Sequence, residues 1–105
     1  MERSQFTIWL DRTNKDLKFE HQKKFGGNYN ELTYTKGRKF IKVKRAGSVW
    51  GFVSMYEGVH KGALVCKGDL LKAADWKTPA KHSRGNIFDG TAKFSYFGPE
   101  YLKNK

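Results

Sequence analysis

Basic residues crowd into one part of the chain, and the chemistry they offer is phosphate binding. No acidic residue occurs between Leu32 and Tyr56, whereas six basic residues do: Lys36, Arg38, Lys39, Lys42, Lys44 and Arg45. Lysine and arginine side chains neutralise phosphates and release counterions, which supplies much of the affinity for nucleic acid. These six residues are therefore the first candidates for a nucleic-acid-binding surface.

Aromatic residues are interleaved with these lysines. The segments 39–45 and 49–56 read as strands, whose side chains alternate between two faces. Phe40, Lys42 and Lys44 then share one face, opposite Ile41 and Val43. If the core-facing side also includes Val49 and Val53, the other side carries three rings among the lysines, which are candidates for base stacking: Phe40, Trp50 and Phe52.

The competing interpretation makes the same rings part of the core. A helix must cover one face of the sheet, and large aromatic side chains are buried more often than they serve as docking sites. We favour this interpretation for the rings. The lysines stay exposed under either interpretation, because lysine is almost never fully buried.

A second basic cluster lies in the segment 77–86, which reads as a loop. It holds Lys77, Lys81, His82 and Arg84. We expect Pro79 to stiffen this loop, Trp76 to anchor its near end and Ile87 with Phe88 its far end, which would make it a contact surface for phosphate. In the alternative, Lys81 and Arg84 pair with Asp75 and Asp89, and both interpretations remain open.

Patterns typical of catalysis are weak. The three histidines lie far apart in the sequence, and no phosphate-binding loop motif occurs. Asp69, Asp75 and Asp89, with Lys72 or Lys77, have the composition of a metal-dependent nuclease site, but their spacing does not support one. We therefore expect no enzymatic activity, no metal and no cofactor. The single cysteine, Cys66, excludes an internal disulfide, and we expect a buried, inert thiol in a reduced cytosolic setting.

The composition predicts one folded domain over residues 1–105. The net charge is +11, and sixteen aromatic residues supply most of the material for a core. A surplus of positive charge of this size favours nucleic acid as a partner. No apolar run approaches the ~20 residues of a membrane-spanning helix, and the N-terminal residues do not read as a signal peptide.

The periodicity of apolar residues places these features on an α+β fold. Residues 4–24 read as a helix, with Ser4 as N-cap, Gly26 as C-cap and an apolar stripe formed by Phe6, Trp9, Leu10, Thr13, Leu17 and Phe25. Strands are expected at 31–35, 39–45, 49–56, 63–67 and 70–75, with a loop at 57–62. We expect one N-terminal helix packed on a four- to five-stranded antiparallel sheet, with a structured basic loop. The aromatic C-terminal tail, with Phe94, Tyr96, Phe97 and Tyr101, is expected to dock on this body.

The segment 67–90, KGDLLKAADWKTPAKHSRGNIFDG, resembles a family of small uncharacterised bacteriophage proteins. The likeness includes KGRKFIKV at 36–43 and the pairs Phe97-Gly98 and Tyr101-Leu102, but not the helix at 4–24. It carries no known catalytic signature. What the resemblance implies is a phage-encoded protein that acts in the cytoplasm of a bacterial host.

These observations rank three functions. The first is a small, basic, non-catalytic nucleic-acid-binding protein, for DNA or RNA, with no membrane partner. The second is a host-takeover or anti-defence factor that binds and inhibits a bacterial protein. The third is a metal-dependent nuclease-like enzyme. The sequence does not determine the oligomeric state.

Overall fold

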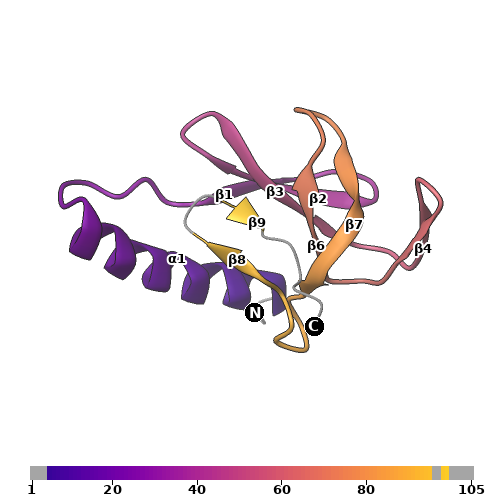
Figure 1. Ribbon diagram of the computed structural model, residues 1–105, viewed down its shortest axis with the longest axis horizontal. Helices are drawn as coiled ribbons and strands as arrows, with labels where there is room; N and C mark the ends of the chain where they lie inside the picture. The colour runs from indigo at the N-terminus through magenta and orange to yellow at the C-terminus, as the bar shows by residue number, and fades with distance from the viewer. Residues whose placement is uncertain (1–4, 96–97, 100–105) are drawn as a thin grey trace.

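The computed structural model describes residues 5–95 and 98–99, and it has the expected α+β architecture. One helix precedes nine short strands: α1 (Gln5–Lys24), β1 (Thr33–Lys36), β2 (Phe40–Arg45), β3 (Ser48–Ser54), β4 (Gly58–His60), β5 (Ala63–Val65), β6 (Asp69–Ala73), β7 (Pro79–Asn86), β8 (Phe94–Ser95) and β9 (Gly98–Pro99). Figure 1 shows α1 along one side of the strands, with β8 and β9 between them. Over the described residues, no helix has the length and apolarity needed to cross a membrane.

Five strands form one antiparallel sheet in the order β1-β2-β3-β6-β7. The strands expected at 31–35, 39–45, 49–56 and 70–75 are confirmed as β1, β2, β3 and β6. The strand expected at 63–67 is present as β5, but it pairs with β4 in a separate hairpin. The segment 57–62 was expected to be a loop, and that prediction is wrong because it contains β4.

Residues 79–86 of the basic segment 77–86 form a strand, so the prediction of a loop is wrong for them. They make up β7, at the edge of the sheet, whereas Lys77 and Thr78 lie in the turn before it. Pro79 begins the strand, a position that suits a residue without an amide N–H. Pairing with β7 also satisfies the backbone N–H and C=O groups of β6, which is largely buried.

The helix buries the stripe that its sequence predicts, except at its last member. Phe6, Trp9, Leu10, Thr13 and Leu17 are buried against the sheet. Phe25 is 61% exposed, so its place in the stripe was predicted wrongly. The helix ends at Lys24, and the amides of Phe25 and Gly26 both donate to the carbonyl of His21, so Phe25 lies at the C-cap, one residue past the helix. Gly26 has a φ of 70°, as a left-handed C-cap requires; Ser4 lies outside the described residues.

A polar contact ties the helix to the chain that enters the sheet. The amide group of Asn14 donates to the carbonyl of Leu32 at 3.2 Å and accepts from the N–H of Leu32 at 2.8 Å. The Tyr29 hydroxyl donates to the same Asn14 oxygen at 2.9 Å. These bonds pair the backbone of a buried residue just before β1 begins.

A β-bulge decides on which face Trp50 lies. In the β2–β3 ladder Val43 pairs with Gly51 and Lys44 with Val49, so Trp50 is the extra residue. Its ring therefore joins the α1 side, with centroids 6.3 Å from Trp9 and 5.6 Å from Phe94. The expectation that Trp50 and Phe52 share a face is wrong. Phe94 shows that the start of the aromatic tail docks on the core, whereas Tyr96, Phe97 and Tyr101 lie outside the described residues.

The packing of α1 on the sheet predicts a contrast between two aliphatic residues of one helix. Leu10 is 6% exposed and Ile8 is 43% exposed. Replacing Leu10 with Ala should lower the free energy of unfolding by about 2–5 kcal/mol, because it leaves a cavity in the core. Ile8→Ala should cost much less. Urea denaturation measures both, and equal losses would show that α1 is not docked through this stripe.

Candidate nucleic-acid interface

The face of the five-stranded sheet turned away from α1, here called the open face, carries two of the predicted lysines. Along β2, Ile41 and Val43 are buried on the α1 side. Phe40, Lys42 and Lys44 alternate with them and are partly exposed on the open face. The predicted alternation of β2 is confirmed, and it places two ammonium groups on the side without a helix.

The β4–β5 hairpin covers part of the open face. Val65 packs with Phe52 and Leu71 in a small second core, where Phe52 is 2% exposed. A buried ring does not stack on a base, so Phe52 is wrong as a stacking residue, and so is Trp50, which is 5% exposed. Phe40 is partly buried, with its ring edge-on to those of Phe52 and Tyr56.

The hairpin is fixed in place by His60. Its Nε2 lies 3.0 Å from the carbonyl oxygen of Pro79 at the start of β7. Its ring centroid is 5.1 Å from that of Phe40. His60 therefore joins the hairpin to both β2 and β7.

Trp76 is the aromatic residue that the open face presents to solvent. We expected it to anchor a loop in the core, but it is 50% exposed, on the turn between β6 and β7. The ammonium of Lys42 lies over its ring, 4.3 Å from the centroid, in a cation–π contact. The neighbouring sequence, Asp75-Trp76-Lys77-Thr78-Pro79, is a turn composition, and this signal could have predicted an exposed ring.

Hydrogen bonds within the turn that carries Trp76 fix its conformation. The Asp75 carboxylate accepts from the amides of Lys77 at 2.9 Å and Thr78 at 2.8 Å. The amides of Ala74 and Asp75 donate to the Thr78 carbonyl. The hydrogen bond from the Lys77 amide, followed by that from Thr78, lowers the pKa of Asp75, and the charge of Lys61 adds to this.

These groups form one continuous set, here called the aromatic–basic surface: Phe40, Tyr56, His60 and Trp76, with Lys39 and Lys42. The Lys39 ammonium lies 5.2 Å from the Tyr56 ring centroid, and the Tyr56 ring is 5.7 Å from Phe40. Lys44, Lys61 and Lys77 lie on the same strand or on the adjoining turns. Cations and rings at this spacing are suited to phosphates and bases.

Two of the arginines predicted to bind phosphate, Arg45 and Arg84, are at least partly buried in the fold. Arg45 is partly buried, where its Nε donates to the carbonyl of Asn30 at 3.3 Å and its guanidinium lies 5.5 Å from the Tyr29 ring. Arg84 is only 6% exposed, so its assignment to phosphate contact is wrong. The carboxylates of its alternative partners, Asp75 and Asp89, accept hydrogen bonds from the backbone, and that of Asp89 also accepts from the Thr91 hydroxyl.

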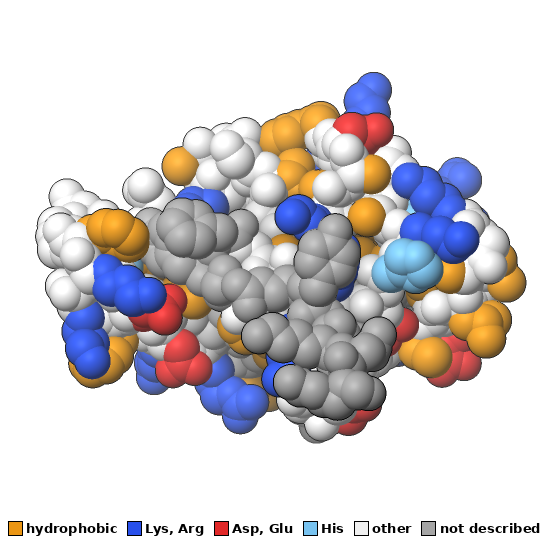
Figure 2. Space-filling model, in the orientation of Figure 1, with side chains coloured by type: hydrophobic (Ala, Val, Ile, Leu, Met, Phe, Trp, Pro, Cys, Tyr) orange, Lys and Arg blue, Asp and Glu red, His pale blue; other side chains and the backbone are white. Residues whose placement is uncertain are grey.

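The other predicted cations are exposed and lie on several elements. Lys36 pairs with Ile41 and so lies on the α1 side of the edge strand β1. Arg38 and Lys39 lie in the β1–β2 turn, Lys77 in the β6–β7 turn, and Lys81 and His82 on β7. Figure 2 shows Lys or Arg side chains and a histidine gathered in the area of β7 and the β4–β5 hairpin.

The segment after Ser83 stabilises the fold. Gly85 has a φ of 96°, and a Cβ there would collide with the backbone of Thr91. The Asn86 side chain donates to the Lys67 carbonyl and to Asp69, and accepts from the amide of Phe88. Ile87 is buried, as expected of an anchor, but Phe88 is 40% exposed, so its burial was predicted wrongly.

The carboxylates proposed for a nuclease site do not converge. Asp69 begins β6, and its oxygens accept from Cys66 and Asn86, whereas Asp75 follows the other end of the strand. Across residues 5–95 and 98–99, no three histidine, cysteine or acidic side chains are grouped to hold a metal ion. Cys66 is exposed, so its predicted burial is wrong. It follows β5, and its backbone amide donates a hydrogen bond to the Asp69 carboxylate.

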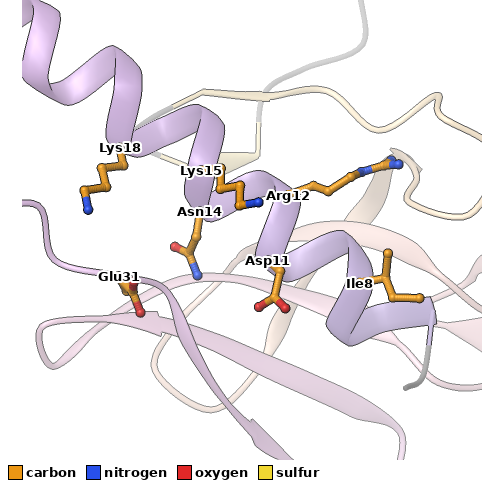
Figure 3. Close-up of a pocket in the computed structure, with 7 residues that line it drawn as sticks. All are labelled: Ile8, Asp11, Arg12, Asn14, Lys15, Lys18 and Glu31. Atoms are coloured by element: carbon orange, nitrogen blue, oxygen red, sulfur yellow. The ribbon is translucent and has the colours of Figure 1, made fainter. Parts of the chain in front are cut away.

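A second basic area lies between α1 and the segment before β1, around a hollow of about 490 Å³. Its lining residues are Ile8, Asp11, Arg12, Asn14, Lys15, Lys18 and Glu31. Figure 3 shows Asn14 and Asp11 pointing toward the segment that carries Glu31, and Arg12 pointing away from it. The two carboxylates offset most of the positive charge, so this hollow is less suited to phosphate than the open face.

Comparison with known proteins assigns a family without a known activity. Residues 4–98 match the model of a family described as "Family of unknown function (DUF7717)", so the chain belongs to that family. The comparison with curated proteins found no match. The comparison with solved structures found none either.

The Asp75 hydrogen bonds predict how the Trp76 turn responds to pH. Because the pKa of Asp75 is lowered in the folded state, ionised Asp75 stabilises the turn above its ordinary pKa, and this contribution is lost as the pH falls through the lowered value. The amide NMR signals of Lys77 and Thr78 should therefore titrate with a midpoint below the ordinary value of about 3.9. They should not titrate in this way in Asp75→Asn. A midpoint at or above the ordinary value would contradict these hydrogen bonds.

Proposed function

We propose that the chain is a small, non-catalytic nucleic-acid-binding protein whose aromatic–basic surface contacts the nucleic acid. The observation that carries this proposal is Lys42, whose ammonium lies on the half-exposed ring of Trp76 on the open face. Lysine and tryptophan together match the two parts of a nucleotide, the anionic phosphate and the flat base. The proposal covers DNA and RNA alike.

The charge distribution supports the same surface. The net charge of +11 attracts polyanions to the whole protein. Strands β1, β2 and β3 contain no acidic residue, and Glu57 and Asp75 are the acids on the segments that complete the aromatic–basic surface. The carboxylate of Asp75 is engaged by backbone amides. Phosphates therefore meet little repulsion there.

The proposed setting comes from the sequence resemblance. The segment 67–90 resembles small bacteriophage proteins, which supports a phage-encoded protein in the cytoplasm of a bacterial host. In this structure the same segment supplies β6, the Trp76 turn and β7. The segment that carries the resemblance is thus also the one that presents Trp76.

One observation favours the second candidate, a factor that binds a host protein. Val59 and Leu64 form a cross-strand pair on the β4–β5 hairpin, 61% and 80% exposed. Figure 2 shows hydrophobic side chains at the end of the molecule that carries this hairpin. Exposed apolar side chains of this kind contribute to protein interfaces. The pair is small beside the basic surface, so nucleic acid remains the leading proposal.

Replacing lysines on the open face should weaken binding in a salt-dependent way. In Lys42→Gln/Lys44→Gln, the slope of log K against log salt should become shallower by about 0.9 per lost contact on duplex DNA and about 0.7 on a single strand. The control is Lys15→Gln/Lys18→Gln on α1, which removes the same charge beside Asp11 and Glu31. Fluorescence anisotropy between about 50 and 200 mM salt measures both.

The control decides whether the effect is local. Both double variants reduce the net charge equally, so a general attraction to the protein would weaken equally in the two. The proposal requires the larger loss in the Lys42/Lys44 variant. Equal losses, or binding that does not depend on salt, would contradict a phosphate site on the open face.

A further inference from the structure

We infer that the aromatic–basic surface selects single-stranded nucleic acid, with Trp76 as the ring on which an unpaired base stacks. The inference rests on the nucleic-acid binding proposed above and names the form that is bound. Of the three tryptophans, all within the described residues, Trp9 and Trp50 are buried and Trp76 is half exposed. A half-exposed tryptophan is unusual, because tryptophan side chains are on average highly buried.

Stacking on Trp76 requires a base whose face is free. In a duplex each base is covered above and below by its neighbours, so a protein ring reaches base faces only where the strand is unpaired. A duplex would offer this surface only its phosphates. The single strand offers phosphate to Lys42 and a base to Trp76, two groups that lie 4.3 Å apart.

The ring is held in position before any ligand arrives. Four hydrogen bonds close the turn at 74–78, two to the Asp75 carboxylate and two to the Thr78 carbonyl. Lys42 comes from β2, which is paired on both sides by β1 and β3. Little conformational freedom is then lost when a base stacks, and this favours binding.

The other rings of the surface have a different role. Phe40 packs edge-on against Phe52, Tyr56 and His60, at interplanar angles of 80°, 82° and 66°. These contacts fix Phe40 in a partly buried position. Phe40 is therefore a partly buried ring on the same strand face as Lys42, whereas Trp76 is half exposed on the β6–β7 turn.

Helix α1 provides a matched comparison. Phe19 is 67% exposed, and the ammonium of Lys23 lies 5.5 Å from its ring centroid. This ring is therefore also an exposed aromatic next to a lysine. Its surroundings include Asp16 and Glu20, which repel phosphate. Phe19→Leu is thus a control for the loss of an exposed ring next to a lysine.

The test compares a fluorescently labelled single strand of about 12 nucleotides, a length within the usual site sizes, with the same strand annealed to its complement. The parent should bind the single strand more tightly. Trp76→Leu should weaken single-strand binding by about 5- to 150-fold, the loss expected for one stacked base, and should leave duplex binding and the salt slope unchanged. Phe19→Leu should bind as the parent does.

A direct readout needs no substitution. Because Trp9 and Trp50 are buried, the single strand should quench the emission of Trp76 and the duplex should not. If circular dichroism shows that Trp76→Leu is unfolded, the test uses Trp76→Phe. This variant retains a smaller ring and should bind the single strand with intermediate affinity. Quenching by the single strand alone supports the inference even then.

Two results would overturn the inference, and only the second would also contradict the proposed nucleic-acid binding. If the parent binds both forms equally and Trp76→Leu matches the parent, stacking is absent, while electrostatic binding through the lysines stands. If neither form binds at about 50 mM salt, the proposed function fails as well. A bacterial protein captured by the parent, and lost when Val59 and Leu64 are replaced by Ser, would then identify the second candidate as correct.

Discussion

The packing of α1 against one face of the sheet is the contact on which the rest of the molecule depends. Leu10, Leu17 and their neighbours bury Ile41 and Val43 of β2. Because successive side chains of a strand point to opposite faces, burying these two residues turns Lys42 and Lys44 to the other side. A slip of one residue in this strand would put the lysines into the core, so the hydrophobic effect itself maintains the register. The basic character of the open face is thus a consequence of core packing.

The β-bulge at Trp50 reconciles two demands on β3. Without it, Trp50 and Phe52 would lie on the same face, and the core under α1 would lose the Trp50 ring. With it, Trp50 packs on Trp9 and Phe94, while Phe52 closes the small core under the β4–β5 hairpin. Both rings are consumed by packing. The half-exposed tryptophan beside Lys42 is a residue on a turn, Trp76.

The parts of the fold that follow a simple period were predictable from the sequence. The stripe of α1 and the alternation of β2 are both repeated over several residues, so local errors do not change the assignment. The face of Trp50 was not predictable, because a bulge is a property of the pairing between two strands and leaves no period in either. Strand β7 was missed for a related reason. Its sequence shows no apolar alternation, and it is held extended by its backbone pairing with β6, which the sequence of β7 does not reveal.

The candidate site was predictable only in part. Lys42 and Lys44 followed from alternation, but Arg84 and Trp76 exchanged the roles expected of them, the cation being buried and the ring exposed. Residue type alone gives the opposite assignment, since arginine is usually exposed and tryptophan usually buried. The contact of Asn14 with Leu32 was also missed, because it joins residues far apart in the sequence and links a side-chain amide to backbone groups, which leaves no pattern of residue types.

The central claim is that nucleic acid binds the open face and not the basic hollow beside α1. An NMR titration of the labelled protein with a short single strand tests this claim most directly. The account predicts chemical-shift changes for the backbone amides of Lys42 and Lys44 and for the Trp76 indole N–H. The indole N–H signals of the buried Trp9 and Trp50 should not shift. Shifts concentrated instead at Arg12, Lys15 and Lys18, with the Trp76 indole unmoved, would contradict it.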